Sequence, residues 1–135
     1  YNLYDREAFE VALQPLCIQH GVGVINFYSL AAGFLTGKYR SSADAGISAR
    51  GPGAAAKYLN PRGHRILSAL DTVAARHEVR PGMVAIAWLL TRTGVTAPIA
   101  SATSLQQLND LVASTRIRLD TTDLAELEAA SLENL

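Results

Sequence analysis

The sequence predicts an α/β fold in which short parallel strands are covered by amphipathic helices. Two short runs, near residues 22–26 and 96–100, have the length and apolar content of buried strands. Segments with helical spacing of apolar residues separate them, and such alternation is typical of a parallel sheet. With 49% hydrophobic and 18% charged residues among 135, the composition is that of a folded globular chain.

The first expected helix begins at Asp5, a good capping residue, and ends near residues 20–21. Pro15 lies inside it, so we expect a kink or a restart there. Its apolar stripe follows helical spacing and consists of Phe9, Leu13 and Leu16.

The first strand run continues into Phe27 and Tyr28. Small residues follow over 29–37, and then a polar segment rich in Gly, Ala and Ser leads to Leu59. We expect this last segment to be a loop of about twenty residues, a length that is usually functional or disordered.

Asn60 followed by Pro61 predicts the start of a helix, because the amide side chain can cap it and proline suits its first turn. Its buried stripe is Ile66, Leu70 and Val73. After a break at 80–82, residues 83–90 are apolar on nearly every side and predict a fully buried helix.

The second strand run leads to Ser104, which is expected to cap another helix. That helix carries an apolar stripe of Leu105, Leu108, Leu111 and Val112. A last helix is expected from Thr122, with Leu124 and Leu127 facing inward.

A (β/α)₈ barrel has about 31 residues per unit, so a chain of this length with one long insertion makes about three units. A fragment of a doubly wound sheet is the alternative, although no Gly-x-Gly-x-x-Gly pattern follows either strand. From the residues alone, the prediction is part of an α/β protein.

The charge and cysteine content argue against several classes. Twelve basic residues balance twelve acidic ones, and no basic stripe indicates binding of nucleic acid or of a membrane surface. The longest apolar run, 83–90, is far shorter than the roughly 20 residues that span a bilayer. The single cysteine, Cys17, cannot form an internal disulfide, so we expect a buried structural thiol and a reducing cytoplasm.

Four segments are similar, in the same order, to segments of aldo-keto reductases. They are YNLYDR at 1–6, GVGVI at 21–25 with SLAAGFLTGKY at 29–39, AIAWLL at 85–90, and VTAPIASATS at 95–104 with Gln107 and Leu108. In that family these form the end of the sixth strand, the seventh strand and cofactor loop, the helix before the last strand, and the eighth strand with its phosphate-binding turn. The resemblance implies the C-terminal part, about the last three β/α units, of a TIM (β/α)₈ barrel. Residues 1–135 are then a partial barrel domain whose N-terminal half is absent.

The resemblance also implies an NADP-dependent oxidoreductase that reduces aldehydes or ketones by hydride transfer. NADPH is the expected cofactor and a small carbonyl compound the expected substrate. NADH stays open, because Ser104 is neutral where many relatives carry a basic residue, and Leu111 stands where relatives often have an asparagine.

Cofactor-binding roles follow from the matched positions. Phe27 matches an aromatic residue that stacks on the nicotinamide, and the loop after it, with Lys38 and Arg50, is expected at the phosphates. The helix start near Ser101 suits an adenosine phosphate. The alternatives are a core aromatic residue, a tight turn and solvated cations. The ten expected residues are Phe27, Tyr28, Ser29, Leu30, Lys38, Arg50, Ser101, Thr103, Gln107 and Asp110, the last two toward the adenine and its ribose.

No catalytic residue is expected in this chain, because the tyrosine, aspartate, lysine and histidine used by the family lie in the first half of its barrel. His20, His64 and His77 are expected to be surface or capping residues, without metal-ligand spacing. Tyr1 and Tyr4 have no neighbouring lysine and histidine to prepare them for acid catalysis.

Two other functions stay open. One is a non-catalytic nucleotide-binding module of the channel-subunit type. The other is a half-barrel without activity of its own, which folds only with the missing N-terminal half or by self-association, because its open strand edges and apolar faces need a partner. The start at Tyr1, which is not a methionine, leads us to expect the middle of a larger protein.

Overall fold

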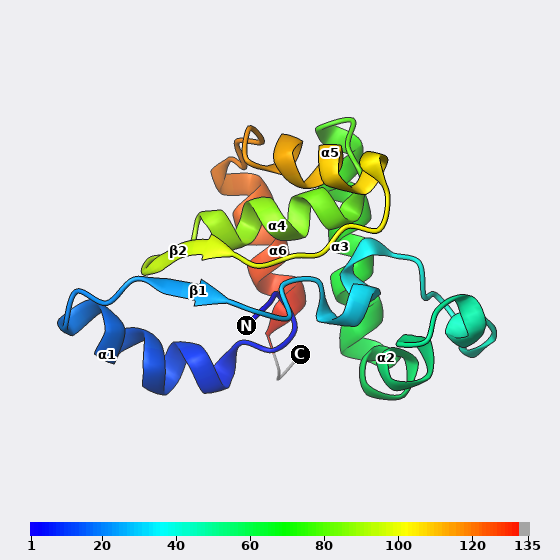
Figure 1. Cartoon of the computed structure of the whole chain (residues 1–135), viewed down its shortest axis with the longest axis horizontal. Helices are drawn as coiled ribbons and strands as arrows, with labels where there is room; N and C mark the ends of the chain where they lie inside the picture. The colour runs from blue at the N-terminus through cyan, green and yellow to red at the C-terminus, as the bar shows by residue number, and fades with distance from the viewer. Residues whose placement is uncertain (133–135) are drawn as a thin grey trace.

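The computed structural model describes residues 1–132 and contains a two-stranded parallel sheet flanked by helices (Figure 1). Strand β1 (Val24–Asn26) pairs with strand β2 (Val95–Pro98), with Val24 opposite Val95 and Asn26 opposite Pro98. The prediction of two adjacent, parallel strands is therefore confirmed. No helix within residues 1–132 is long and apolar enough to cross a membrane.

The expected burial of the strands is wrong within the described residues. Ile25 in β1 is 63% exposed and Ile99, just after β2, is 54% exposed. Helix α4 (Pro81–Leu90) packs on β2. Pairing along one edge does not cover the side chains that project from the faces of the sheet. Within the described residues no further layer covers Ile25 and Ile99, so both face solvent.

The first helical segment changes type along its length. A π-helical turn, η1 (Phe9–Leu13), runs directly into α1 (Gln14–Gln19), with Pro15 in the first turn of α1. The predicted restart at this proline is observed, because a first turn needs no donor from the proline nitrogen. Asp5 does not cap the segment: no side chain caps η1. Of the predicted stripe only Phe9 is buried.

The predicted twenty-residue loop is wrong. The 3₁₀ turn η2 (Ala31–Thr36) precedes this segment, and the segment itself holds a second 3₁₀ turn, η3 (Ser42–Ile47), and then helix α2 (Gly51–Tyr58). The composition concealed α2, because its two glycines and its proline are typical of loops. Tyr58 is buried in the core, and it stacks on Phe34 with ring centroids 5.2 Å apart. Tertiary packing therefore stabilises a helix that local propensity leaves weak.

Helix α3 (Pro61–Arg76) begins as predicted: the Asn60 side chain accepts a hydrogen bond from the Gly63 amide (3.0 Å). A side chain at Gly63 would place its Cβ 1.8 Å from the Tyr58 carbonyl oxygen, so glycine permits α2 and α3 to meet closely. The predicted stripe of Ile66, Leu70 and Val73 is buried, and residues 84–89 make α4 a buried helix.

The last two helices are α5 (Leu105–Ser114) and α6 (Thr121–Ser131). Ser104 caps α5 as predicted, since its hydroxyl accepts from the Gln107 amide (3.2 Å). The apolar stripe of α5 is largely exposed, with Leu105 79% accessible. Leu127 of α6 is buried in the core as expected, and the partly buried Leu124 packs against that core. The core thus lies among α3, α4, α6 and the segment after β1.

Candidate functional site

The segments that follow the two strands are tied together by Ser29. This residue is buried, and its hydroxyl donates to the Ile99 carbonyl oxygen (2.8 Å) while Asn26 Nδ2 approaches it at 3.2 Å. Because β1 and β2 are parallel, both segments leave the same end of the sheet (Figure 1). The predicted Ser29 hydroxyl is therefore engaged within the protein, where it joins the two groups of predicted cofactor residues.

The turn after β1 presents two aromatic rings to solvent. Phe27 is 69% exposed and Tyr28 is 54% exposed, with their rings edge to face at 6.0 Å. Tyr28 has φ of 64°, in the left-handed region that non-glycine residues rarely adopt. The buried side chain of Asn2 holds this turn by donating to the Tyr28 carbonyl oxygen (3.1 Å). Strained backbone of this kind is frequent at ligand sites.

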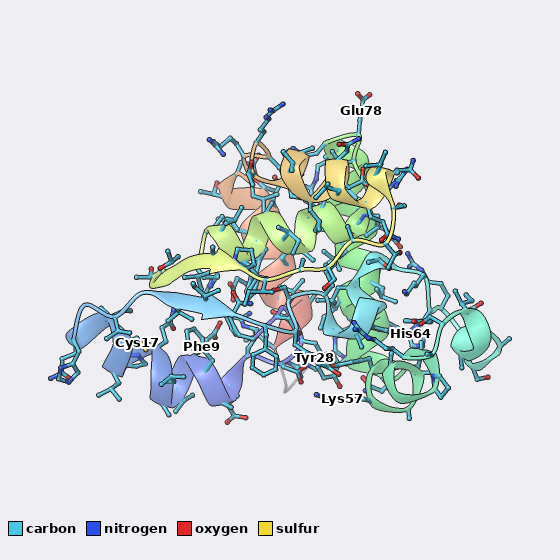
Figure 2. All side chains as sticks on the ribbon, viewed as in Figure 1. Phe9, Cys17, Tyr28, Lys57, His64 and Glu78 are labelled. Carbon is cyan, nitrogen blue, oxygen red and sulfur yellow. The ribbon has the colours of Figure 1, made fainter. Side chains whose placement is uncertain are left out.

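A pocket of about 400 Å³ lies between this turn and α2. We call it the Tyr28–Arg50 pocket, because it unites these two predicted cofactor residues. Its cations are Arg50 and Lys57, and Figure 2 shows Lys57 beside Tyr28. The lining residues are Tyr28, Ala32, Ala49, Arg50, Gly53, Ala54, Lys57 and Tyr58.

The sequence prediction missed Lys57 and Tyr58 at this pocket. A usable pattern was present: positions 50, 53, 54 and 57 have the i, i+3, i+4, i+7 spacing of one helix face. The expectation of a loop over this segment hid it.

A carboxylate lies behind the pocket lining. Asp5 accepts from Lys57 Nζ (2.8 Å), Tyr58 Oη (2.7 Å) and Asn2 Nδ2 (3.1 Å). Burial alone opposes ionisation of Asp5, but these hydrogen bonds outweigh it and hold the pKa of Asp5 below its usual value. Burial, with the bond to Asp5, raises the pKa of Tyr58. At neutral pH the pocket therefore has an anion behind it and a neutral phenol in its wall.

Lys38 and Leu30 lie outside the lining of this pocket. Lys38 is exposed, with Nζ 5.0 Å from the centre of the Tyr39 ring, and its chain passes so close to Gly33 that a Cβ there would lie 2.7 Å from Lys38 Cε. The partly buried Leu30 side chain packs against the core.

The second group of predicted residues lies at the start of α5. Ser101 and Thr103 are exposed, and Gln107 Oε1 accepts from both the amide (2.8 Å) and the hydroxyl (3.1 Å) of Thr103. Asp110 forms an ion pair with Arg80 at 2.6 Å. These existing bonds engage Gln107 through Oε1 and Asp110 through Oδ2.

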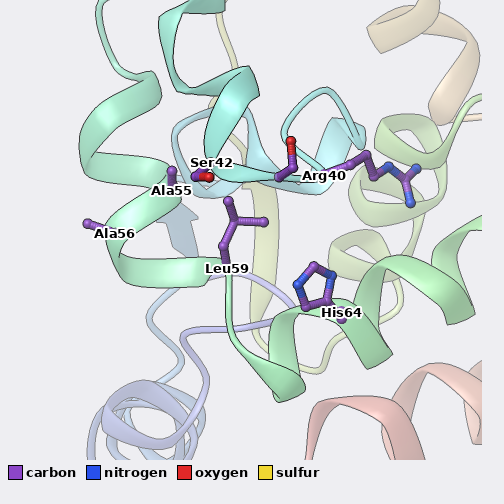
Figure 3. Close-up of a pocket in the computed structure, with 7 residues that line it drawn as sticks. Arg40, Ser42, Ala55, Ala56, Leu59 and His64 are labelled. Carbon is purple, nitrogen blue, oxygen red and sulfur yellow. The ribbon is translucent and has the colours of Figure 1, made fainter.

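A second hollow of about 450 Å³ lies on the other side of α2 (Figure 3). Its cation, Arg40, is held by two bonds to the Asp71 carboxylate (2.6 and 2.8 Å). None of the ten predicted residues lines it, which makes it the weaker candidate for a phosphate. It is lined by Arg40, Ser41, Ser42, Ala55, Ala56, Leu59 and His64.

The histidines have the predicted surface and capping positions. His20 and His77 follow the last residues of α1 and α3, and His77 Nε2 lies 2.6 Å from Asp123 Oδ2. His64 is exposed on α3. Within residues 1–132 there is no group of three or more His, Cys, Asp or Glu residues that could hold a metal ion.

Tyr1 is poorly prepared for proton donation. Burial, together with its hydrogen bond to Glu10 Oε1 (2.6 Å), raises the pKa of Tyr1. A catalytic acid needs the opposite shift. Cys17 is partly exposed on α1, so its predicted full burial is wrong (Figure 2).

The aldo/keto reductase family matches residues 1–132. A probable voltage-gated potassium channel subunit beta of Arabidopsis thaliana is 31% identical over 117 residues, which are 82% of this chain and 35% of that protein. The L-glyceraldehyde 3-phosphate reductase of Escherichia coli O157:H7 is 30% identical over 134 residues, which are 95% of this chain and 39% of the reductase.

A solved structure of a thermostable aldo-keto reductase with the inhibitor epalrestat has the same fold, with a TM-score of 0.68 and 20% identity. The match covers 96% of this chain and 37% of that one. The chain thus spans less than half the length of these proteins. Its helices and two strands have the fold of one part of such a barrel, with the sheet left open.

Proposed function

Because this chain belongs to the aldo-keto reductase family, we propose that the protein containing it is an NADP-dependent oxidoreductase that reduces aldehydes or ketones. The chain has the fold of about the last three β/α units of a TIM barrel. We propose that residues 1–135 are a partial barrel domain that supplies cofactor-binding surface, while the catalytic groups belong to the N-terminal half of the barrel.

The Tyr28–Arg50 pocket carries this proposal. It combines two cations with an exposed aromatic turn. That turn follows β1, and the segment leading to α5 follows β2 at the same end of the sheet. Phosphates are bound in proteins by such cations and by the free amides of a helix N-terminus. The residues present therefore fit an extended dinucleotide, with one phosphate group at Arg50 and another at the start of α5.

In this proposal, the residues of this chain bind and orient the cofactor. A nicotinamide cofactor supplies the hydride when bound. The exposed ring of Phe27 offers a flat apolar face for the nicotinamide, and Arg50 and Lys57 attract the phosphates. Ser101 and Thr103 border the amides of α5, Gln107 lies in its first turn and Asp110 in its second.

The runner-up function is a non-catalytic nucleotide-binding module, which the similarity to the potassium channel subunit beta favours. It needs the same cofactor site and no proton donor. A third possibility is a half-barrel that is inactive unless the N-terminal half or a second copy covers its exposed apolar side chains. A reducing cytoplasm stays our expected location, on the free thiol of Cys17.

Titration of the complete protein with NADPH and NADH tests the proposal. We expect binding of NADPH that weakens in Arg50→Ala and Thr103→Ala, and turnover of small aldehydes. Binding without turnover would favour the module of the channel-subunit type. Absence of dinucleotide binding would refute both functions.

A further inference from the structure

One carboxylate connects the two walls of the Tyr28–Arg50 pocket. Asp5 Oδ1 accepts from Lys57 Nζ at 2.8 Å, and Asp5 Oδ2 accepts from Tyr58 Oη at 2.7 Å. Lys57 and Tyr58 are the last two residues of α2, and both line the pocket. Asp5 itself is not in the lining, so it holds the α2 wall from behind.

The opposite wall is reached through one amide. Asn2 is completely buried, and its Nδ2 donates to Asp5 Oδ2 (3.1 Å) and to the Tyr28 carbonyl oxygen (3.1 Å). Asn2 Oδ1 accepts from the Tyr4 and Asp5 amides, each at 2.9 Å, so this side chain has no freedom to turn. The strained Tyr28 turn is thereby linked to α2 through Asn2 and Asp5. We call these four residues, Asn2, Asp5, Lys57 and Tyr58, the Asp5 network.

We propose that Asp5 is a positioning residue for the nucleotide cofactor, which joins α2 to the Tyr28 turn and directs the Lys57 ammonium toward the pocket beside Arg50. This inference rests on the proposed function, since it requires the cofactor phosphates to occupy this pocket. Asp5 contacts no ligand in this scheme. It fixes a long, exposed lysine side chain, whose other contact is that of Nζ with the Tyr58 ring, 4.9 Å from the ring centre.

The charge of Asp5 does not cancel the attraction of Lys57 for a phosphate. A phosphate oxygen on the far side of the ammonium lies about 2.8 Å from Nζ and therefore about 5.6 Å from the Asp5 carboxylate. Coulomb energy falls with distance, so the attraction is roughly twice the repulsion. The hydrogen bonds from Lys57, Tyr58 and Asn2 outweigh the effect of burial and keep the pKa of Asp5 low, so the network stays charged at neutral pH.

The test uses the complete protein and NADPH as the probe. Asp5→Asn preserves the size of the side chain and removes its charge. We expect NADPH dissociation to become about ten-fold faster, equivalent to about 1.4 kcal/mol. Lys57→Met should have a similar effect, and the double variant should add little to either single one, as for two residues that act through one contact.

Asp71→Asn is the matched control, because it breaks the comparable Arg40–Asp71 ion pair (2.6 Å) outside this pocket. It should leave the dissociation rate unchanged. Melting of the ligand-free variants separates positioning from general loosening, and Lys57→Met tests the same contact in an exposed side chain if Asp5→Asn fails to fold.

Three results would overturn the role of Asp5: unchanged dissociation in a folded Asp5→Asn protein, full additivity in the double variant, or equal acceleration in Asp71→Asn. Each of them leaves the proposed function intact if the unaltered protein binds NADPH. Failure of the unaltered protein to bind NADPH contradicts the proposed function, and the role of Asp5 then falls with it.

Discussion

Residues 1–135 produced alone should self-associate and lack a sharp cooperative melt. The reason is the apolar surface that the described fold leaves open, on the sheet face and along α1 and α5. Six large side chains represent this surface, each at least half exposed: Leu13 in η1, Leu16, Ile25, Phe27, Ile99 and Leu105.

The magnitude follows from burial. Full burial of a large apolar side chain stabilises by roughly 1.5 to 3 kcal/mol, so six half-exposed ones forgo about 5 to 9 kcal/mol together. A whole domain has a net stability of only about 5 to 15 kcal/mol. The loss is therefore comparable to the net stability of a whole domain. Association of chains through the open strand edges would bury part of the exposed apolar surface.

Sedimentation velocity and thermal unfolding of the purified 135-residue chain measure this directly. We expect oligomers or aggregates, a broad transition, and no carbonyl reduction. A monomer with a cooperative melt would refute the reasoning from exposed surface. Carbonyl reduction by such a monomer would mean that one of its tyrosines or histidines donates the proton.

Three further predictions concern the complete protein. Ser29→Ala should destabilise it by about 1 kcal/mol, because the hydrogen bond from the buried Ser29 hydroxyl to the Ile99 carbonyl oxygen is lost, and urea unfolding that matches the unaltered protein would contradict this. Gly63→Ala should cost about 1 to 3 kcal/mol in the same assay, since its Cβ would lie 1.8 Å from a carbonyl oxygen, whereas Gly53→Ala meets no atom within 4 Å and should not destabilise the protein. Burial raises the pKa of Asp123, but the hydrogen bond to His77 and a backbone amide outweigh it and hold that pKa below the usual 3.8. A lowered carboxyl pKa contributes stability at neutral pH that is lost as the pH falls below about 4, so stability should decrease there, and less in Asp123→Asn.

The sequence predicted the starts of two helices correctly, because a helix start depends on residues that are close together in the sequence. Asn60 and Ser104 cap helices as expected, because a short polar side chain ahead of a helical pattern has one favourable use. The burial of the strands could not be predicted from their composition. Ile25 and Ile99 are apolar whether or not another layer covers them, and residues 1–132 contain no such layer for them.

The candidate site was predictable in part. Matched motifs pointed to Tyr28 and Arg50, and these two residues line one pocket. Asp5 was expected to be a helix cap, the common role of an aspartate before a helical pattern, but its partners Lys57 and Tyr58 lie more than fifty residues away in the sequence. Contacts between residues so far apart in the sequence are set by tertiary packing, and no local sequence pattern predicts them.

A structure of the complete protein with NADPH bound tests most directly whether this segment holds the cofactor. We expect a phosphate group within about 3 Å of the Arg50 guanidinium, the adenosine phosphate at the start of α5, and the nicotinamide against Phe27. A dinucleotide bound elsewhere, with the Tyr28–Arg50 pocket filled only by solvent, would contradict the assignment of this chain as cofactor-binding surface.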